Sequence, residues 1–247
     1  MKSMASPNLS PALMTPYLHS VKLCDRTLKN QNISMTLNEP INAFDRTPPY
    51  CIVHNFLGGD LIERLLTHAK THESEFTSAK VTDHQLHTEM RVSRVLRNLG
   101  ELSEEIDAKF KAVISQAILD LGLFPFELAR CEIELVAHED GAFFKRHIDT
   151  QTGMHDQKSQ RVMTGVLYFY STPKGFSGGQ LRLYPLSPSA VNFVDIEPEC
   201  DRLVLFPAWV PHEVMPISCP SGSFGQSRFA INCWYRRPIL TASSVDG

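Results

Sequence analysis

Three side chains that can bind a metal stand at a spacing that restricts how the chain can fold. His147 and Asp149 lie two residues apart in an expected strand, and His212 follows much later. Side chains two residues apart on a β-strand point to the same face, so His147 and Asp149 project together while Ile148 projects away. His212 must then come from a second strand whose end lies beside the first. The spacing therefore predicts a β-sheet structure in which neighbouring strand ends meet at one metal ion.

These three side chains have the chemistry of an iron site. Two imidazoles and one carboxylate on one side of a metal leave the opposite positions open, which is the ligand arrangement of non-haem Fe(II) oxygenases. The chain has a second His-x-Asp sequence, from His138 to Asp140, followed by Gly141. Asp-Gly between two strand-like runs is typical of a hairpin turn, in which those side chains diverge. We therefore assign the metal to His147 and Asp149 together with His212.

Short apolar segments separated by turn residues dominate the chain after residue 130. We expect eight strands there, at residues 131–138, 143–149, 161–170, 179–185, 190–196, 202–206, 211–217 and 227–236. Before them, apolar periodicity predicts a strand at 50–57 and helices at 60–72 and 103–121, the second capped by Ser103. This order favours an α+β fold, a double-stranded β-helix (a jelly-roll or cupin-type barrel) buttressed by the N-terminal helices.

Composition and charge narrow the domain organisation and the class of partner. A chain of 247 residues with 43% hydrophobic residues suits one sizeable domain, which we place at residues 46–240, after an N-terminal arm at 1–45 that is expected to be poorly ordered. The net charge of −3, without a basic cluster, argues against nucleic-acid and membrane-surface partners. Six scattered cysteines and the lack of a long apolar N-terminal stretch indicate a cytoplasmic protein with reduced thiols.

Several further motifs accompany the three metal-binding side chains in a fixed order. They stand at Glu139–Asp149, Arg161–Tyr168, Gly178–Pro185, His212–Pro216 and Ser227–Trp234. Together these segments resemble the prolyl 4-hydroxylase-like family of Fe(II)/2-oxoglutarate-dependent oxygenases, and the resemblance covers roughly residues 48–237.

The resemblance implies a role for each of several residues. His147, Asp149 and His212 would hold Fe(II). Arg228 would pair with the distal carboxylate of 2-oxoglutarate, to which Tyr168 would donate its hydroxyl, and Thr164 and Asn232 are further candidate cosubstrate contacts. An arginine suits this role because its planar fork can bind both carboxylate oxygens. The candidate substrate contacts are Arg91 and Trp234.

The implied reaction is hydroxylation of an aliphatic C–H bond with Fe(II), 2-oxoglutarate and O2, releasing succinate and CO2, with ascorbate as a further candidate cofactor. The chain departs from the family pattern at two places. His138 replaces a tyrosine that the family usually has, and residues 218–226 resemble an inserted surface loop before Arg228. These departures favour a small-molecule substrate, an amino acid or a natural-product intermediate.

Three alternatives stay open at this stage. The first is a peptidyl prolyl hydroxylase, because fold does not determine the substrate. The second is a metal-binding cupin-like enzyme that does not use 2-oxoglutarate, in which Arg228 would be dispensable. The third is a binding module that keeps the barrel without turnover.

Overall fold

The computed structural model describes residues 46–79, 90–150, 158–187 and 192–239, which all belong to one unit spanning residues 39–247. The expected N-terminal arm, residues 1–45, lies outside the described residues. None of the helices in the described ranges combines the length and apolar character needed to cross a membrane.

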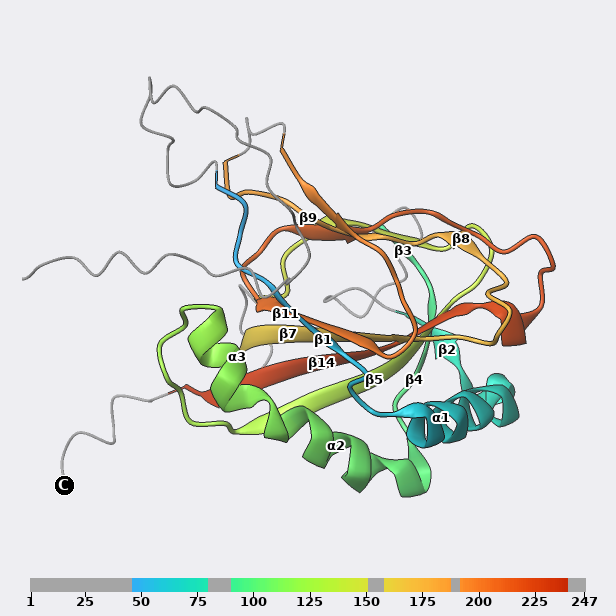
Figure 1. The fold of residues 1–247 in the computed structure, drawn as a ribbon, viewed down its shortest axis with the longest axis horizontal. Helices are drawn as coiled ribbons and strands as arrows, with labels where there is room; N and C mark the ends of the chain where they lie inside the picture. Colours follow the sequence, from blue (N-terminus) through green and yellow to red (C-terminus); the bar gives the residue numbers. More distant parts are fainter. Residues whose placement is uncertain (1–45, 80–89, 151–157, 188–191, 240–247) are drawn as a thin grey trace, which may run out of the picture. The chain divides into compact units, whose positions relative to one another are not determined.

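Long antiparallel strands form a large sheet through the middle of the described residues (Figure 1). Its order is β1 (Cys51–His54), β11 (Arg202–Pro207), β7 (Ser159–Phe169), β14 (Arg228–Pro238), β5 (Arg130–His138), β4 (Arg94–Leu96) and β2 (Thr77–Ser78). The central strand β14 pairs with β7 on one side and β5 on the other. Within each of these antiparallel strands, successive side chains face opposite sides of the sheet.

A second antiparallel sheet lies over one face of the large one (Figure 1). Its order is β10 (Val194–Ile196), β9 (Leu181–Leu183), β12 (His212–Val214), β6 (Phe143–His147) and β3 (Arg91–Val92). A short pair, β8 (Ser177–Gly178) and β13 (Ile217–Ser218), adds to this side. Val204 and Ala230 of the large sheet pack with Leu183 of the small one in a single buried cluster. Two facing antiparallel sheets of this kind are the layout of a jelly roll.

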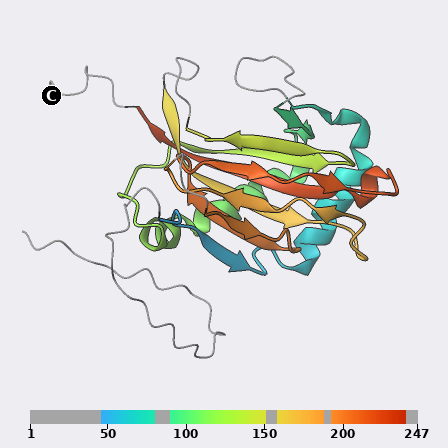
Figure 2. The same ribbon diagram turned by 90° about the horizontal axis from the view of Figure 1, so that it is seen from above.

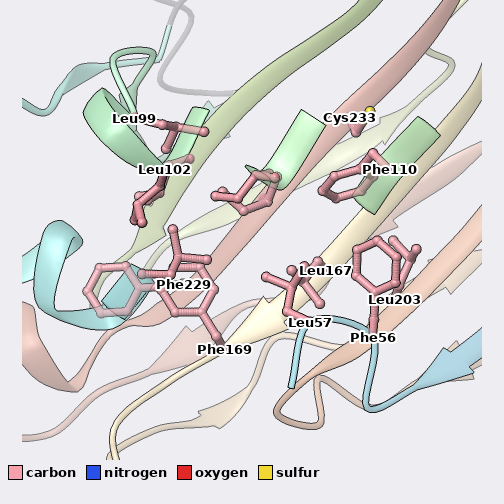
Figure 3. Close-up of a cluster of buried hydrophobic side chains, with 14 of the residues drawn as sticks. Phe56, Leu57, Leu99, Leu102, Phe110, Leu167, Phe169, Leu203, Phe229 and Cys233 are labelled. Atoms are coloured by element: carbon pink, nitrogen blue, oxygen red, sulfur yellow. The ribbon is translucent and has the colours of Figure 1, made fainter. Parts of the chain in front are cut away.

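Helices α1 (Gly59–Thr71), α2 (Ser103–Ala112) and α3 (Ile114–Asp120) lie along the other face of the large sheet (Figures 1 and 2). Their buried residues, such as Leu65 and Phe110, join Leu167 and Phe229 of the sheet in the largest apolar cluster. Figure 3 shows Phe110 beside Phe56, whose rings meet edge to face at 5.1 Å. Burying each such side chain contributes about 1.5–3 kcal/mol, so this layer stabilises the sheet that carries the site.

The helix expected at 103–121 is two helices, and Ser103 is not its cap. A 3₁₀ helix, η3 (Gly100–Leu102), runs directly into α2, so the residue before the helix, Leu102, already has helical backbone angles. Val113, at φ −92 and ψ −7, separates α2 from α3. Apolar periodicity did not reveal this break because Phe110 and Ala117, on either side of it, both remain in the core under the sheet.

The segment expected to be an inserted surface loop at 218–226 is anchored to the core at two points. It contains a 3₁₀ helix, η4 (Phe224–Gln226), in which the Phe224 ring packs edge-on against Phe76 at 5.1 Å and Phe229 at 5.3 Å. Asp140 accepts a hydrogen bond of 2.7 Å from the Cys219 amide at the other end of the loop. A further 3₁₀ helix, η2 (Glu73–Glu75), precedes Phe76. The loop is therefore anchored at Cys219 and Phe224, which are buried, while residues 220–223 between them are exposed.

Candidate functional site

His147, Asp149 and His212 come together between the two sheets. His147 Nε2 lies 3.7 Å from one Asp149 oxygen, and His212 Nε2 lies 3.5 Å from the other. One ligand atom from each residue can be chosen so that all three lie within 4.8 Å of one another. Asp149 and His212 are buried, and His147 is partly buried. Among the described residues no other group of three or more His, Cys, Asp or Glu side chains converges in this way.

Strand pairing explains how residues so far apart in sequence meet. His147 of β6 and His212 of β12 are directly opposite each other in the register of the small sheet. The strand expected at 143–149 ends earlier, at His147, so Asp149 lies just beyond it and is fixed by a 2.9 Å hydrogen bond from its amide to the Ala208 carbonyl. Asp149 still points to the side of His147, while Ile148 is 42% exposed.

Backbone carbonyls set which nitrogen of each imidazole is available. His147 Nδ1 lies 2.8 Å from the Lys145 carbonyl, and His212 Nδ1 lies 2.9 Å from the Val210 carbonyl. A carbonyl only accepts, so each Nδ1 must donate a hydrogen and each Nε2 keeps its lone pair toward Asp149. Metal-binding histidines commonly use this arrangement, because the second hydrogen bond fixes both tautomer and ring orientation.

The electrostatics of these groups also suits a divalent metal. Burial, reinforced by the neighbouring His212, lowers the pKa of His147 to about 3, so its imidazole is neutral as a ligand must be. Burial opposes ionisation of Asp149, but the two neighbouring histidines and a 2.7 Å hydrogen bond from the Thr164 hydroxyl outweigh it and lower the pKa. Two neutral nitrogens and one carboxylate form a donor set that could hold Fe(II).

Arg228 lies in the same cavity with a positive charge that lacks a counter-ion. It is 1% exposed, and no carboxylate of the described residues pairs with it. Its Nη1 donates to His138 Nδ1 at 3.0 Å, whereas its Nε and Nη2 have no partner. The ring of Tyr168 lies 4.8 Å from the guanidinium carbon, and the Tyr168 hydroxyl is also unpartnered. Buried charges are costly unless paired, so this pocket is suited to an anion such as a carboxylate.

A glycine makes room for this arginine. A Cβ at Gly179, whose φ is +73, would lie 2.6 Å from Arg228 Cδ, closer than such atoms approach. Gly179 of the Gly178-Gly179 motif is therefore required for close packing against Arg228 as well as for its backbone conformation. Arg182, the other arginine in this motif, pairs with Asp195 at 2.6 Å on β10 and does not line the cavity.

The cavity gathers most of the residues that the sequence singled out. Besides the three metal-binding side chains and Arg228, it is lined by Thr164, Asn232, Arg91 and Trp234. Tyr168 lies behind Arg228 and is fully buried; burial raises the pKa of its hydroxyl, which therefore stays protonated.

Five lining residues were not singled out from the sequence as site residues: His138, Phe144, Val166, Leu181 and Val214. Phe144 stacks on the His147 ring with centroids 3.5 Å apart. Phe144 and His147 are the β6 partners of Val214 and His212, and strict alternation would place them on opposite faces. Phe144 faces the cavity because β6 is irregular between these two residues. The register partner of Arg228 on β5 is His138. The available sequence signal for His138 was its place where the family usually has a tyrosine.

This chain is similar to known proteins. The family model of the 2OG-Fe(II) oxygenase superfamily matches residues 133–236, which hold every candidate site residue except Arg91. A PKHD-type hydroxylase of Synechocystis is 31% identical over 229 residues, covering 87% of this chain and 74% of its own length. The hypoxia-inducible factor prolyl hydroxylase of Caenorhabditis elegans is 35% identical over 101 residues, 39% of this chain and 12% of its own length. A Pseudomonas putida prolyl-4-hydroxylase structure superposes with a TM-score of 0.57 at 25% identity, covering 77% of this chain and 94% of that chain.

The chain belongs to the 2OG-Fe(II) oxygenase superfamily. Within it, the chain is prolyl hydroxylase-like, and it is a 2-oxoglutarate-dependent dioxygenase of the hydroxylase type. The prediction made from the sequence motifs is thereby confirmed, and the family implies Fe(II), 2-oxoglutarate and O2.

Proposed function

We propose that this enzyme hydroxylates an aliphatic C–H bond of a prolyl residue in a peptide or protein, releasing succinate and CO2. The observation that carries the cosubstrate part is the buried, unpaired Nε and Nη2 of Arg228 in the cavity that also holds His147, Asp149 and His212. A dicarboxylate that reaches both the metal and Arg228 would satisfy these donors.

In this proposal His147, Asp149 and His212 hold the iron, which when bound activates O2 for oxidation of the C–H bond. The protein contributes ligand geometry and charge. The carbonyls of Lys145 and Val210 fix the imidazoles, and the Thr164 hydroxyl orients the Asp149 carboxylate.

Arg228 and Tyr168 bind the distal carboxylate of 2-oxoglutarate. The free Nε–H and Nη2–H of Arg228 are the parallel pair that can donate to both carboxylate oxygens, and the Tyr168 hydroxyl supplies a third donor. Asn232 lies four residues after Arg228 on β14, so the two side chains share a face. Asn232 also lines the cavity and is a further cosubstrate contact.

Arg91 and Trp234 are the proposed substrate contacts. Arg91 is nearly buried on edge strand β3, where its Nε donates to Ser93 at 2.7 Å and its guanidinium lies 4.9 Å from the Phe144 ring centre. The indole nitrogen of Trp234 is buried without a partner, while Arg161 covers the ring at 3.7 Å. A substrate backbone carbonyl could accept from either donor.

One observation favours a peptide over a small molecule: the similarity of this chain extends to prolyl hydroxylases. Of the two departures that favoured a small molecule, His138 contacts Arg228, and Phe224 of the 218–226 segment packs against Phe229 on the helix side of the sheet.

The test is succinate release by the Fe(II)-loaded enzyme in a panel of proline-containing peptides, free proline and other amino acids, with and without ascorbate. We expect peptide-dependent succinate and a matching mass gain of one oxygen on proline. Stimulation by free amino acids alone would replace the peptide with a small-molecule substrate. His212→Ala protein serves as the control for uncatalysed release.

A further inference from the structure

We propose that His138 is the positioning residue of the cosubstrate pocket: its imidazole holds one arm of the Arg228 guanidinium, so that the remaining Nε and Nη2 edge is presented to the cosubstrate. This inference rests on the proposed role of Arg228.

Strand register places the two residues against each other. His138 at the end of β5 and Arg228 at the start of β14 are direct partners, and both face the cavity. They are 3% and 1% exposed, and Arg228 Nη1 donates to His138 Nδ1 over 3.0 Å. Because both side chains are almost fully buried, losing the acceptor would leave one more donor of a charged group without a protein partner.

The contact defines the tautomer and charge of His138. A guanidinium only donates, so Nδ1 must accept and the imidazole proton must lie on Nε2. The charged groups that face this imidazole are Arg228 and Arg91. Burial, followed by these two cations, lowers the pKa of His138 well below its usual value. His138 is therefore a neutral acceptor, which a protonated imidazole could not be.

The other contacts of Arg228 confine it without orienting its fork. The Tyr168 ring lies against the guanidinium at 4.8 Å, and the absent side chain of Gly179 leaves room for the stem. Among the described residues, His138 is the one whose acceptor atom meets hydrogen-bond geometry with the Arg228 guanidinium. It occupies Nη1 and leaves Nε and Nη2 unpartnered, the pair of parallel N–H groups that binds a carboxylate side-on.

The test compares two substitutions that differ in the acceptor. His138→Leu removes it, whereas the Asn in His138→Asn can place its oxygen near the position of Nδ1. We titrate each anaerobic Fe(II)-loaded protein with 2-oxoglutarate and with 2-oxobutanoate, which keeps the keto acid but lacks the distal carboxylate. His138→Leu should weaken 2-oxoglutarate binding about tenfold or more, since hydrogen bonds to charged groups are worth that much. Binding of 2-oxobutanoate should stay unchanged, and His138→Asn should restore most of the loss.

Two controls separate the possible failures. Tyr235→Phe removes another buried hydrogen bond, from the Tyr235 hydroxyl to the Phe110 carbonyl on the opposite face of β14, and should leave 2-oxoglutarate binding intact. If Arg228→Ala binds 2-oxoglutarate normally, the proposed function itself is wrong. If Arg228→Ala loses binding but His138→Leu does not, or if His138→Leu weakens both ligands equally, only the positioning role is overturned.

A measurement on the unsubstituted protein covers the case in which His138→Leu does not fold. The ¹⁵N NMR shifts of the His138 ring should show a proton on Nε2 and none on Nδ1. A protonated Nδ1 would overturn the proposal.

Discussion

The two faces of strand β14 differ in chemistry although they belong to one strand. Phe229, Ile231, Cys233 and Tyr235 face the helices and are all fully buried in the main apolar cluster. Arg228, Asn232 and Trp234 face the small sheet and line the cavity, where several of their polar atoms have no protein partner. One face stabilises the sheet, and the other holds groups that cost stability unless a ligand satisfies them.

Strand β5, which pairs with β14, has the same division into an apolar face and a polar face. On β5, Leu135 and Ala137 lie in the helix-side cluster, whereas Glu134 and His138 are buried on the cavity side. Buried polar and charged side chains concentrate on the cavity side, as is common at functional sites. The comparison teaches that substitutions on one face should change stability, and substitutions on the other should change ligand binding.

The largest expected effect on the cavity side is loss of the metal. In His212→Ala the donor set keeps one imidazole and one carboxylate, and we expect activity to fall by more than about 100-fold, the upper range for residues that only support a ligand. Bound iron and the anaerobic 2-oxoglutarate absorption band measure this directly. His54→Ala, at an exposed histidine of β1, is the matched control and should behave as wild type. Near-normal turnover of His212→Ala would remove this residue from the site.

The largest expected effect on the helix side is on stability. Phe110 is fully buried, so Phe110→Ala should lower the free energy of unfolding by about 3–5 kcal/mol. Denaturant unfolding gives this value, and 2-oxoglutarate affinity below the transition should be unchanged. Phe124, which is 91% exposed, offers a control: Phe124→Ala should change stability by less than about 0.5 kcal/mol. Weakened cosubstrate binding in Phe110→Ala would mean that the two faces are coupled.

The cavity side should also control how stability depends on pH. The folded pKa of His147 is lowered to about 3, and that of His138 is lowered in the same direction, while both titrate near 6.5 when unfolded. Below pH 6.5 the unfolded chain therefore binds more protons, and stability falls as pH falls toward about 3, the folded pKa of His147. His147 contributes about 1.4 kcal/mol per pH unit in that window, and the lowered pKa of His138 adds to the loss in the same direction. Unfolding of the metal-free protein tests the slope, which His138→Asn should reduce and Phe110→Ala should not.

Two tyrosines provide the smallest and finest comparison. Tyr168→Phe removes an unpartnered hydroxyl on the cavity side and should weaken 2-oxoglutarate binding about fivefold without loss of stability. Tyr235→Phe on the helix side should cost about 1 kcal/mol of stability and leave the affinity unchanged. Opposite results for the pair would reverse the assignment of the two faces.

Strand alternation predicted much of this arrangement because it is a local property. The shared side of His147 and Asp149, and the common face of Arg228 and Asn232, follow from residues two or four apart. The jelly-roll layout followed from the number and spacing of short apolar segments. Such features need no knowledge of distant contacts.

Features that depend on distant contacts were not predictable in this way. The break at Val113 leaves the apolar pattern intact, so nothing local marks it. The anchoring of Phe224 depends on Phe76 and Phe229, and the partner of His138 depends on the register between β5 and β14. The irregularity in β6 that turns Phe144 toward His147 also arises from pairing between strands.

The central claim is that the unpaired edge of Arg228 binds the distal carboxylate of 2-oxoglutarate beside the metal. The most direct test is the 2-oxoglutarate concentration that gives half-maximal succinate release by Arg228→Ala, with Arg182→Ala as the surface control. Losing one partner of such a buried pair costs about 2–5 kcal/mol, so Arg228→Ala should need roughly 30- to 3,000-fold more cosubstrate while still binding Fe(II). Arg182→Ala should match the wild type, because Arg182 pairs with Asp195 outside the cavity. An unchanged cosubstrate requirement in Arg228→Ala would contradict the account.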